Sequence, residues 1–98
     1  MFNFFKKQPA DESLEKITRT LSRIIELLKQ SEGSPWVSIT PQDIIEQLSQ
    51  TLEVINESNI ERELEKIRLL FAPTGSLQDI SIDNGWGEEF IKLASVFD

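Results

Sequence analysis

Apolar residues between positions 11 and 32 recur at alternating spacings of three and four, which is the period of an amphipathic α-helix. The stripe consists of Leu14, Ile17, Leu21, Ile24 and Leu28, with Ile25 beside it. The additional isoleucine gives the stripe the width of a globular core, broader than the seam of a coiled coil. Gly33 and Pro35 then interrupt the pattern, because glycine ends helices and proline prevents their continuation. The pattern predicts a helix over residues 11–32.

A second helix is predicted from Thr40 to about Asn56, and its start is the clearest local signal in the chain. Thr40 is a favoured N-cap, Pro41 suits the first helical position, and the carboxylate of Asp43 complements the positive helix N-terminus. The predicted core-facing side of this helix consists of Ile44, Ile45, Leu48, Leu52 and Ile55.

A third helix is predicted to begin after Ser58, because Ser58 and Glu61 have the spacing of a capping box. Pro73 should end it at Phe71 or Ala72. Its apolar positions are Ile60, Leu64, Ile67, Leu70 and Phe71. Its charged positions are predicted to form a solvated outer face; they are Glu61, Arg62, Glu63, Glu65, Lys66 and Arg68.

The segment that follows allows two structures. The alternation of isoleucine and serine at 80–82 fits a short extended segment over residues 77–82. Ser76 followed by Asp79 fits equally well the cap of a single helical turn. Six residues are too few for their periodicity to separate these alternatives.

A short C-terminal helix completes the pattern, running from about residue 86 to residue 97. Its apolar face contains Phe90, Leu93, Ala94 and Phe97, and Ile91 is a further candidate for this face. The four segments together predict an all-α fold, a small antiparallel or orthogonal bundle of three long helices and one short helix. Since neither a linker nor a repeat separates them, residues 11–98 are predicted to form a single helical domain.

Residues 1–10 are predicted to form an N-terminal arm that is both apolar and basic and that ends at Pro9. The arm contains Phe2, Phe4 and Phe5, followed by Lys6 and Lys7. Three interpretations stay open. The arm covers a gap in the core of its own domain, packs on a neighbouring subunit, or anchors the protein weakly to a membrane surface.

The charge of the chain is unevenly distributed. The net charge is −7. Residues 1–38 hold six Lys or Arg and five Asp or Glu, whereas residues 39–98 hold four and twelve. An acidic surface repels phosphate backbones, so we expect no nucleic-acid partner. It favours a basic protein partner, although acidic residues also serve solubility alone.

The composition also bears on the compartment. The absence of cysteine fits a reducing cytosol. No apolar run approaches the roughly 20 residues that a membrane span needs. At the N-terminus the basic residues follow the apolar ones, which is the reverse of a secretory signal, and Phe2 excludes N-myristoylation. We therefore expect a cytoplasmic protein without a membrane span.

Candidate chemistry is sparse. The chain lacks histidine and cysteine, the side chains most used for proton transfer, nucleophilic attack and metal binding near neutral pH. Asp79, Ser81 and Asp83 resemble the start of a calcium loop, but Asn84 replaces the required glycine and Phe90 the required glutamate. We therefore predict a non-enzymatic protein without catalytic residues, cofactor or metal site.

The two tryptophans and the acidic C-terminal half supply the candidates for partner binding. Tryptophan at the end of a bundle is either a core anchor or a binding hot spot, and both interpretations apply here. The candidate contact residues are Trp36, Glu53, Glu57, Glu61, Glu65, Asp83, Trp86, Glu88 and Glu89.

Residues 69–82 resemble a segment found in a small family of uncharacterised bacterial helical domains. The matching residues are Gly75, Ser76, Leu77 and Asp79, whereas Pro73 and Thr74 differ from the glycine and methionine of the family pattern. Some members of that family are associated with toxin–immunity gene clusters. The resemblance implies a small cytosolic helical protein and assigns no catalytic residue.

Three functions follow as hypotheses. The first is a non-enzymatic protein–protein interaction module, of immunity type if the resemblance holds, that uses the acidic C-terminal half. The alternative is a self-associating structural domain, a homodimer in the simplest case. The third is a small enzyme or a carrier of an apolar ligand, and the carrier requires an apolar cavity between the helices.

Overall fold

A computed structural model describes residues 9–35, 37–72 and 75–97, and these residues form helices joined by turns, without a strand among them. The elements are α1 (Pro9–Lys29), α2 (Pro41–Val54), α3 (Ile60–Ile67), the 3-10 helix η1 (Arg68–Phe71), α4 (Ser76–Asp83), α5 (Gly87–Ala94) and the 3-10 helix η2 (Ser95–Phe97). The all-α prediction is confirmed. None of the described helices is both long and apolar enough to cross a membrane.

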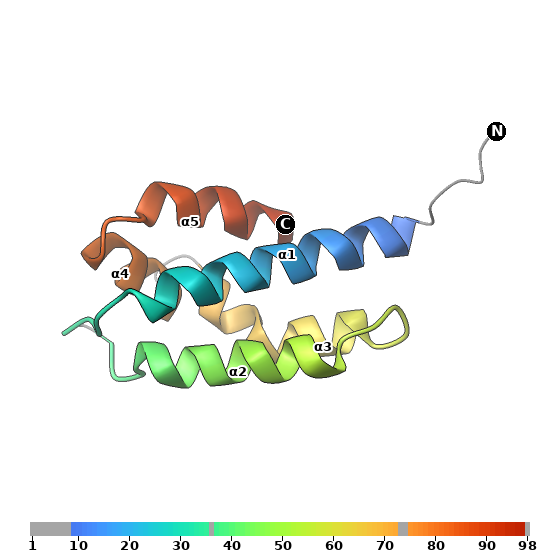
Figure 1. The fold of residues 1–98 in the computed structure, drawn as a ribbon, viewed down its shortest axis with the longest axis horizontal. Coiled ribbons are helices and arrows are strands. Elements are labelled where there is room, and N and C mark those ends of the chain that lie inside the picture. Colours follow the sequence, from blue (N-terminus) through green and yellow to red (C-terminus); the bar gives the residue numbers. More distant parts are fainter. Residues whose placement is uncertain (1–8, 36, 73–74, 98) are drawn as a thin grey trace.

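Helix α1 lies in the middle of the molecule (Figure 1). It packs against α2 on one side and against α5 and η2 on the other. Helix α3 runs back along α2, and α4 forms the corner that connects η1 to α5. This arrangement places the α2–α3 turn and the α4–α5 corner at opposite ends of the molecule (Figure 1).

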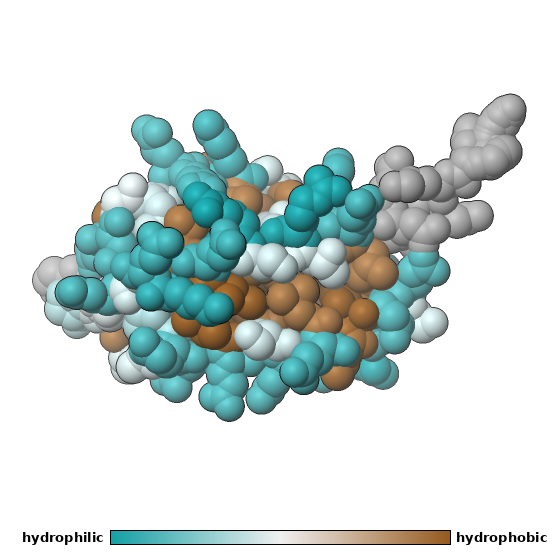
Figure 2. Space-filling model, in the orientation of Figure 1, coloured by the Kyte–Doolittle hydropathy of each residue, from teal (hydrophilic) through white to brown (hydrophobic). Residues whose placement is uncertain are grey.

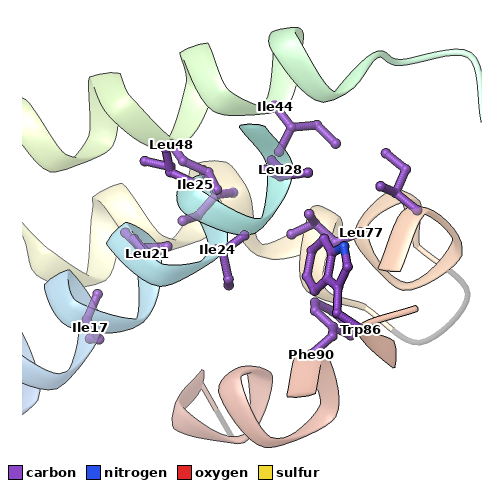
Figure 3. Packing of buried hydrophobic residues seen from close by; sticks show 12 residues of the cluster. Ile17, Leu21, Ile24, Ile25, Leu28, Ile44, Leu48, Leu77, Trp86 and Phe90 are labelled. Atoms are coloured by element: carbon purple, nitrogen blue, oxygen red, sulfur yellow. The ribbon is translucent and has the colours of Figure 1, made fainter. Parts of the chain in front are cut away.

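The core is built around the apolar stripe of α1. Leu21, Ile24 and Leu28 are fully buried. Figure 3 shows Ile44 and Leu48 of α2 close to the α1 stripe, while Trp86 and Phe90 approach it from the other side. Burying each large aliphatic side chain contributes about 1.5–3 kcal/mol, so the two-sided contacts of α1 supply much of the stability of the fold.

The predicted start of α2 is confirmed in detail. Thr40 is the N-cap, and its Oγ1 accepts a hydrogen bond from the Asp43 backbone N–H at 3.1 Å. The Asp43 carboxylate in turn accepts from the Thr40 backbone N–H at 3.4 Å. Because the two side chains satisfy backbone donors that the helix leaves unpaired, this turn is fixed by local chemistry.

The predicted capping box of the third helix is wrong. Helix α3 begins at Ile60, and its N-cap Asn59 makes no side-chain capping bond. The turn before it is held by two asparagines instead. Asn56 Oδ1 accepts hydrogen bonds from the backbone N–H groups of Ser58 and Asn59. Asn59 Nδ2 donates a hydrogen bond to the Val54 carbonyl at 2.8 Å. Asparagine side chains often close turns in this way.

Residues 77–82 are helical, so the extended alternative is wrong. In a strand, Ile80 and Ile82 would share a face. In α4, Ile80 is fully buried together with Leu77, whereas Ile82 is largely exposed. The N-cap is Gly75, not Ser76. A Cβ at position 75 would lie only 2.8 Å from the carbonyl oxygens of Leu69 and Ala72, so glycine is the residue that fits there.

The helix lengths differ from the predicted three long helices and one short helix. Helices α1 and α2 have 21 and 14 residues, and α3, α4 and α5 have eight each. The third predicted helix is shorter because the chain tightens into η1 after Ile67, which leaves Leu69 exposed.

The predicted boundary of the N-terminal arm at residue 10 falls within a helix, because α1 begins at Pro9. Residues 1–8 lie outside the described residues.

We expect Thr40→Ala to lower the free energy of unfolding by about 1 kcal/mol, because it removes the N-cap acceptor. Urea denaturation monitored by circular dichroism measures this loss. Ser38→Ala, at an exposed position just before the cap, is the matched control and should change stability little. Equal stabilities for the two variants would contradict the capping role of Thr40.

Candidate functional site

The structure divides the predicted contact residues into two groups. Glu53, Glu57, Glu61 and Glu65 are exposed around the α2–α3 turn. Asp83, Glu88 and Glu89 belong to the α4–α5 corner. Since these regions lie at opposite ends of the molecule (Figure 1), the predicted residues do not form one continuous surface. Trp36 lies outside the described residues.

Trp86 is a core anchor at the α4–α5 corner, which is one of the two interpretations that its sequence position allowed, and its burial removes it from the candidate contact surface. Its side chain is only 8% exposed and meets Phe90 edge-on, with the ring centroids 6.3 Å apart. Its Nε1–H donates to Ser31 Oγ at 2.9 Å. Buried indoles normally find such an acceptor, and this one attaches the corner to the segment that leaves α1.

Two neighbouring side chains strengthen the same attachment. The Asn84 side chain accepts from the Glu32 backbone N–H at 3.0 Å and donates to the Glu32 carbonyl at 2.9 Å. The Ser34 hydroxyl donates to the Asp83 carboxylate. Asp83 is therefore engaged within the chain. Gly85 closes the turn with a φ of +87°, in the left-handed region that favours glycine.

Glu89 forms the main ion pair of the corner. The Arg23 guanidinium of α1 donates from Nε and Nη2 to the two Glu89 carboxylate oxygens, at 2.7 and 3.2 Å. These hydrogen bonds hold the pKa of Glu89 below its usual range. The neighbouring Glu88 is exposed and makes no ion pair within the described part of the chain. Its negative charge is thus the more available of the two.

Glu63 also departs from its predicted position on the solvated face of the third helix. Its side chain is buried, because residues 60, 63 and 67 share the inward face of α3. The carboxylate accepts from Lys66 Nζ at 3.1 Å and lies 3.6 Å from Arg62 Nε. Burying a carboxylate costs free energy unless such partners compensate its charge. The sequence pattern did not predict that Glu63 is buried.

Exposed apolar side chains adjoin Glu88. Ile82 is 58% exposed and Ile91 is 65% exposed, and both border the same shallow depression as Glu88 and Glu89. We call the surface formed by Ile82, Glu88, Glu89 and Ile91 the α4–α5 edge. Sequence reasoning missed Ile82, but the helical spacing of Leu77, Ile80 and Ser81 would have placed it off the buried face.

A second hollow lies between α3–η1 and α5–η2. It is an open groove of about 650 Å³. Its lining is mostly apolar and consists of Leu64, Ile67, Arg68, Phe71, Ala72, Gln78, Phe90, Ile91, Ala94, Ser95 and Phe97. We call it the η1–α5 groove. The sequence pattern assigned most of these residues to the core, whereas the structure places them along this groove.

Among the described residues, no group of three or more acidic side chains is placed to hold a metal ion. The arrangement offers two surfaces, namely an apolar edge beside the exposed carboxylate of Glu88 and an apolar groove, and both suit recognition by shape and charge.

We expect Glu89→Gln to destabilise the protein slightly at pH 7, because it removes an ion pair that joins α5 to α1. Because the pKa of Glu89 is lower in the folded protein than in the unfolded chain, the ionised carboxylate stabilises the fold at pH values above the unfolded-state pKa. This stabilisation is lost as the pH falls through the folded-state pKa of Glu89. The stability difference between the wild type and Glu89→Gln should therefore shrink below about pH 4. Urea denaturation between pH 7 and pH 3 measures it. Glu88→Gln is the control, and an equal pH-dependent difference for that variant would contradict the assignment.

Comparisons with known proteins identify no relative of this chain: no family model matches it, and neither a curated protein nor a solved structure gives a significant match. The resemblance of residues 69–82 stays a prediction.

Proposed function

We propose that this chain is a non-enzymatic protein-interaction module that binds a polypeptide through the α4–α5 edge. The observation that carries the proposal is the exposure of Ile82 and Ile91 beside the carboxylate of Glu88. Large apolar side chains exposed next to one another are costly to keep in water and often mark interaction sites. A partner that covered them would remove this cost.

The chemistry of the edge supports a basic partner. Binding energy at protein interfaces comes from a few apolar anchors, and surrounding charges select the partner and speed association. The two isoleucines are suited to contact an apolar anchor. Glu88 lies beside them and makes no ion pair among the described residues, so its carboxylate places a negative charge at the border of this surface. A polypeptide with an apolar side chain flanked by lysine or arginine would match both features.

An immunity-type role in the cytoplasm is the specific form of this proposal. It rests on the resemblance of residues 69–82 to domains associated with toxin–immunity gene clusters. In that role the partner would be a toxin that carries a basic surface. The matching residues, Gly75, Ser76, Leu77 and Asp79, lie at the start of α4, the helix that also carries Ile82.

Self-association is the second candidate, and a different surface favours it. Figure 2 shows a band of apolar side chains between α1 and α2, bordered by polar ones. The described residues of these helices include half-buried Leu14, Ile45 and Leu52. A second copy that packed on this band would bury it across a twofold axis.

Affinity capture from a lysate of the source cells tests the proposal. We expect the wild type to retain a basic polypeptide at low ionic strength and to release it at moderate salt, because screening weakens attraction between surface charges. Ile82→Gln should reduce capture at least about fivefold, as expected when an interface anchor is lost.

Val54→Gln is the matched control. Val54 is 50% exposed and, like Ile82, lies in the last turn of a helix, but it belongs to α2. Its substitution should leave capture unchanged. Failure to retain any polypeptide at low salt, or equal capture by wild type and Ile82→Gln, would refute the proposal. Recovery of only a second copy of the chain would favour self-association.

A further inference from the structure

The η1–α5 groove has the dimensions of a small-molecule site. Its volume of about 650 Å³ falls within the roughly 300–1,000 Å³ typical of ligand pockets. The small side chains of Ala72, Ala94 and Ser95 leave it open. It is therefore an open, mostly apolar groove between helices, of a size that suits a small ligand.

The floor of the groove is aromatic. The Phe71 ring lies 4.4 Å from the Phe97 ring and 6.1 Å from the Phe90 ring, measured between centroids. Phe90 is buried beneath, whereas Phe71 and Phe97 are half-buried. Two aromatic rings with partly uncovered surfaces would gain contacts from an alkyl chain laid over them.

One charge borders the groove. Arg68 is the only charged residue among those that the structure describes in its lining, although the whole chain carries a net charge of −7. Its side chain is 73% exposed and pairs with Glu65 through Nε at 3.6 Å. The guanidinium has five N–H donors in a planar fork, so the Nη groups remain suited to a carboxylate.

We propose that the η1–α5 groove binds a single-chain amphiphile with an anionic head, its carboxylate at Arg68 and its alkyl tail over Phe71 and Phe97. The position of Arg68 argues for this ligand. A basic peptide would meet like charge at Arg68, whereas an alkyl carboxylate satisfies both the charge and the apolar floor. The groove adjoins the polypeptide surface proposed above: Ile91 belongs to both and Gln78 lines both hollows, whereas Ile82, Glu88 and Glu89 do not line the groove.

Isothermal titration calorimetry with three probes that share a ten-carbon tail tests the proposal. The probes are decanoate, decanol and decyltrimethylammonium, each below the concentration at which it self-associates. Decanoate should bind about three- to fivefold more tightly than decanol, which is the range of an exposed ion pair. Decyltrimethylammonium should bind most weakly, although the net charge of the protein favours it.

Two arginine variants provide a matched pair. Arg68→Gln should abolish the preference for decanoate over decanol. Arg19→Gln is the control, because Arg19 is also 73% exposed and pairs with an exposed glutamate on its own helix, but it does not line the groove. Arg19→Gln should leave the preference unchanged.

Filling the groove tests its location. Ala94→Phe should abolish binding of all three probes, and Ser95→Phe, at an exposed position of the lining, serves if the first variant does not fold. Ile82→Gln should leave decanoate binding unchanged, so this proposal and that of the α4–α5 edge can fail separately. The proposal is overturned if decanoate does not bind, if the cationic probe binds as tightly, or if both arginine variants behave alike.

Discussion

The fold depends on the burial of α1 from two sides. Leu21, Ile24 and Leu28 are completely buried, and they reach this state because α2 covers one side of the helix while α5 and η2 cover the other. A stripe of this width cannot be buried by one neighbouring helix. The chain after α1 therefore has to supply two layers, and the α2–α3 hairpin and the α4–α5 corner are these layers (Figure 1).

The second layer is fixed at the C-terminal end of α1 by specific polar contacts. The indole of Trp86 and the amide of Asn84 both bond to the segment that leaves α1, at Ser31 and Glu32. With the corner held there, α4 and α5 bury Leu77, Ile80 and Phe90 and leave Ile82 and Ile91 outside. The α4–α5 edge and the η1–α5 groove are thus consequences of how the second layer is attached.

The sequence predicts what local chemistry decides. The all-α fold, the stripe of α1 and the cap at Thr40 depend on periodicity and on contacts within one turn, and all three are confirmed. The burial of Glu63 depends on how α3 packs, and the segment over residues 76–83 is too short for its pattern to separate a helix from a strand. The candidate site shows the same limit, since only the packing separates the acidic residues at the α2–α3 turn from those at the α4–α5 corner.

The central claim is that the α4–α5 edge is the surface that receives a polypeptide partner. Amide hydrogen exchange of the chain, alone and with its co-purified partner, tests this claim most directly, because it locates the covered backbone segments. The account predicts slower exchange over residues 82–92 in the complex and unchanged exchange over residues 53–61. Protection over residues 53–61, with residues 82–92 unaffected, would contradict it.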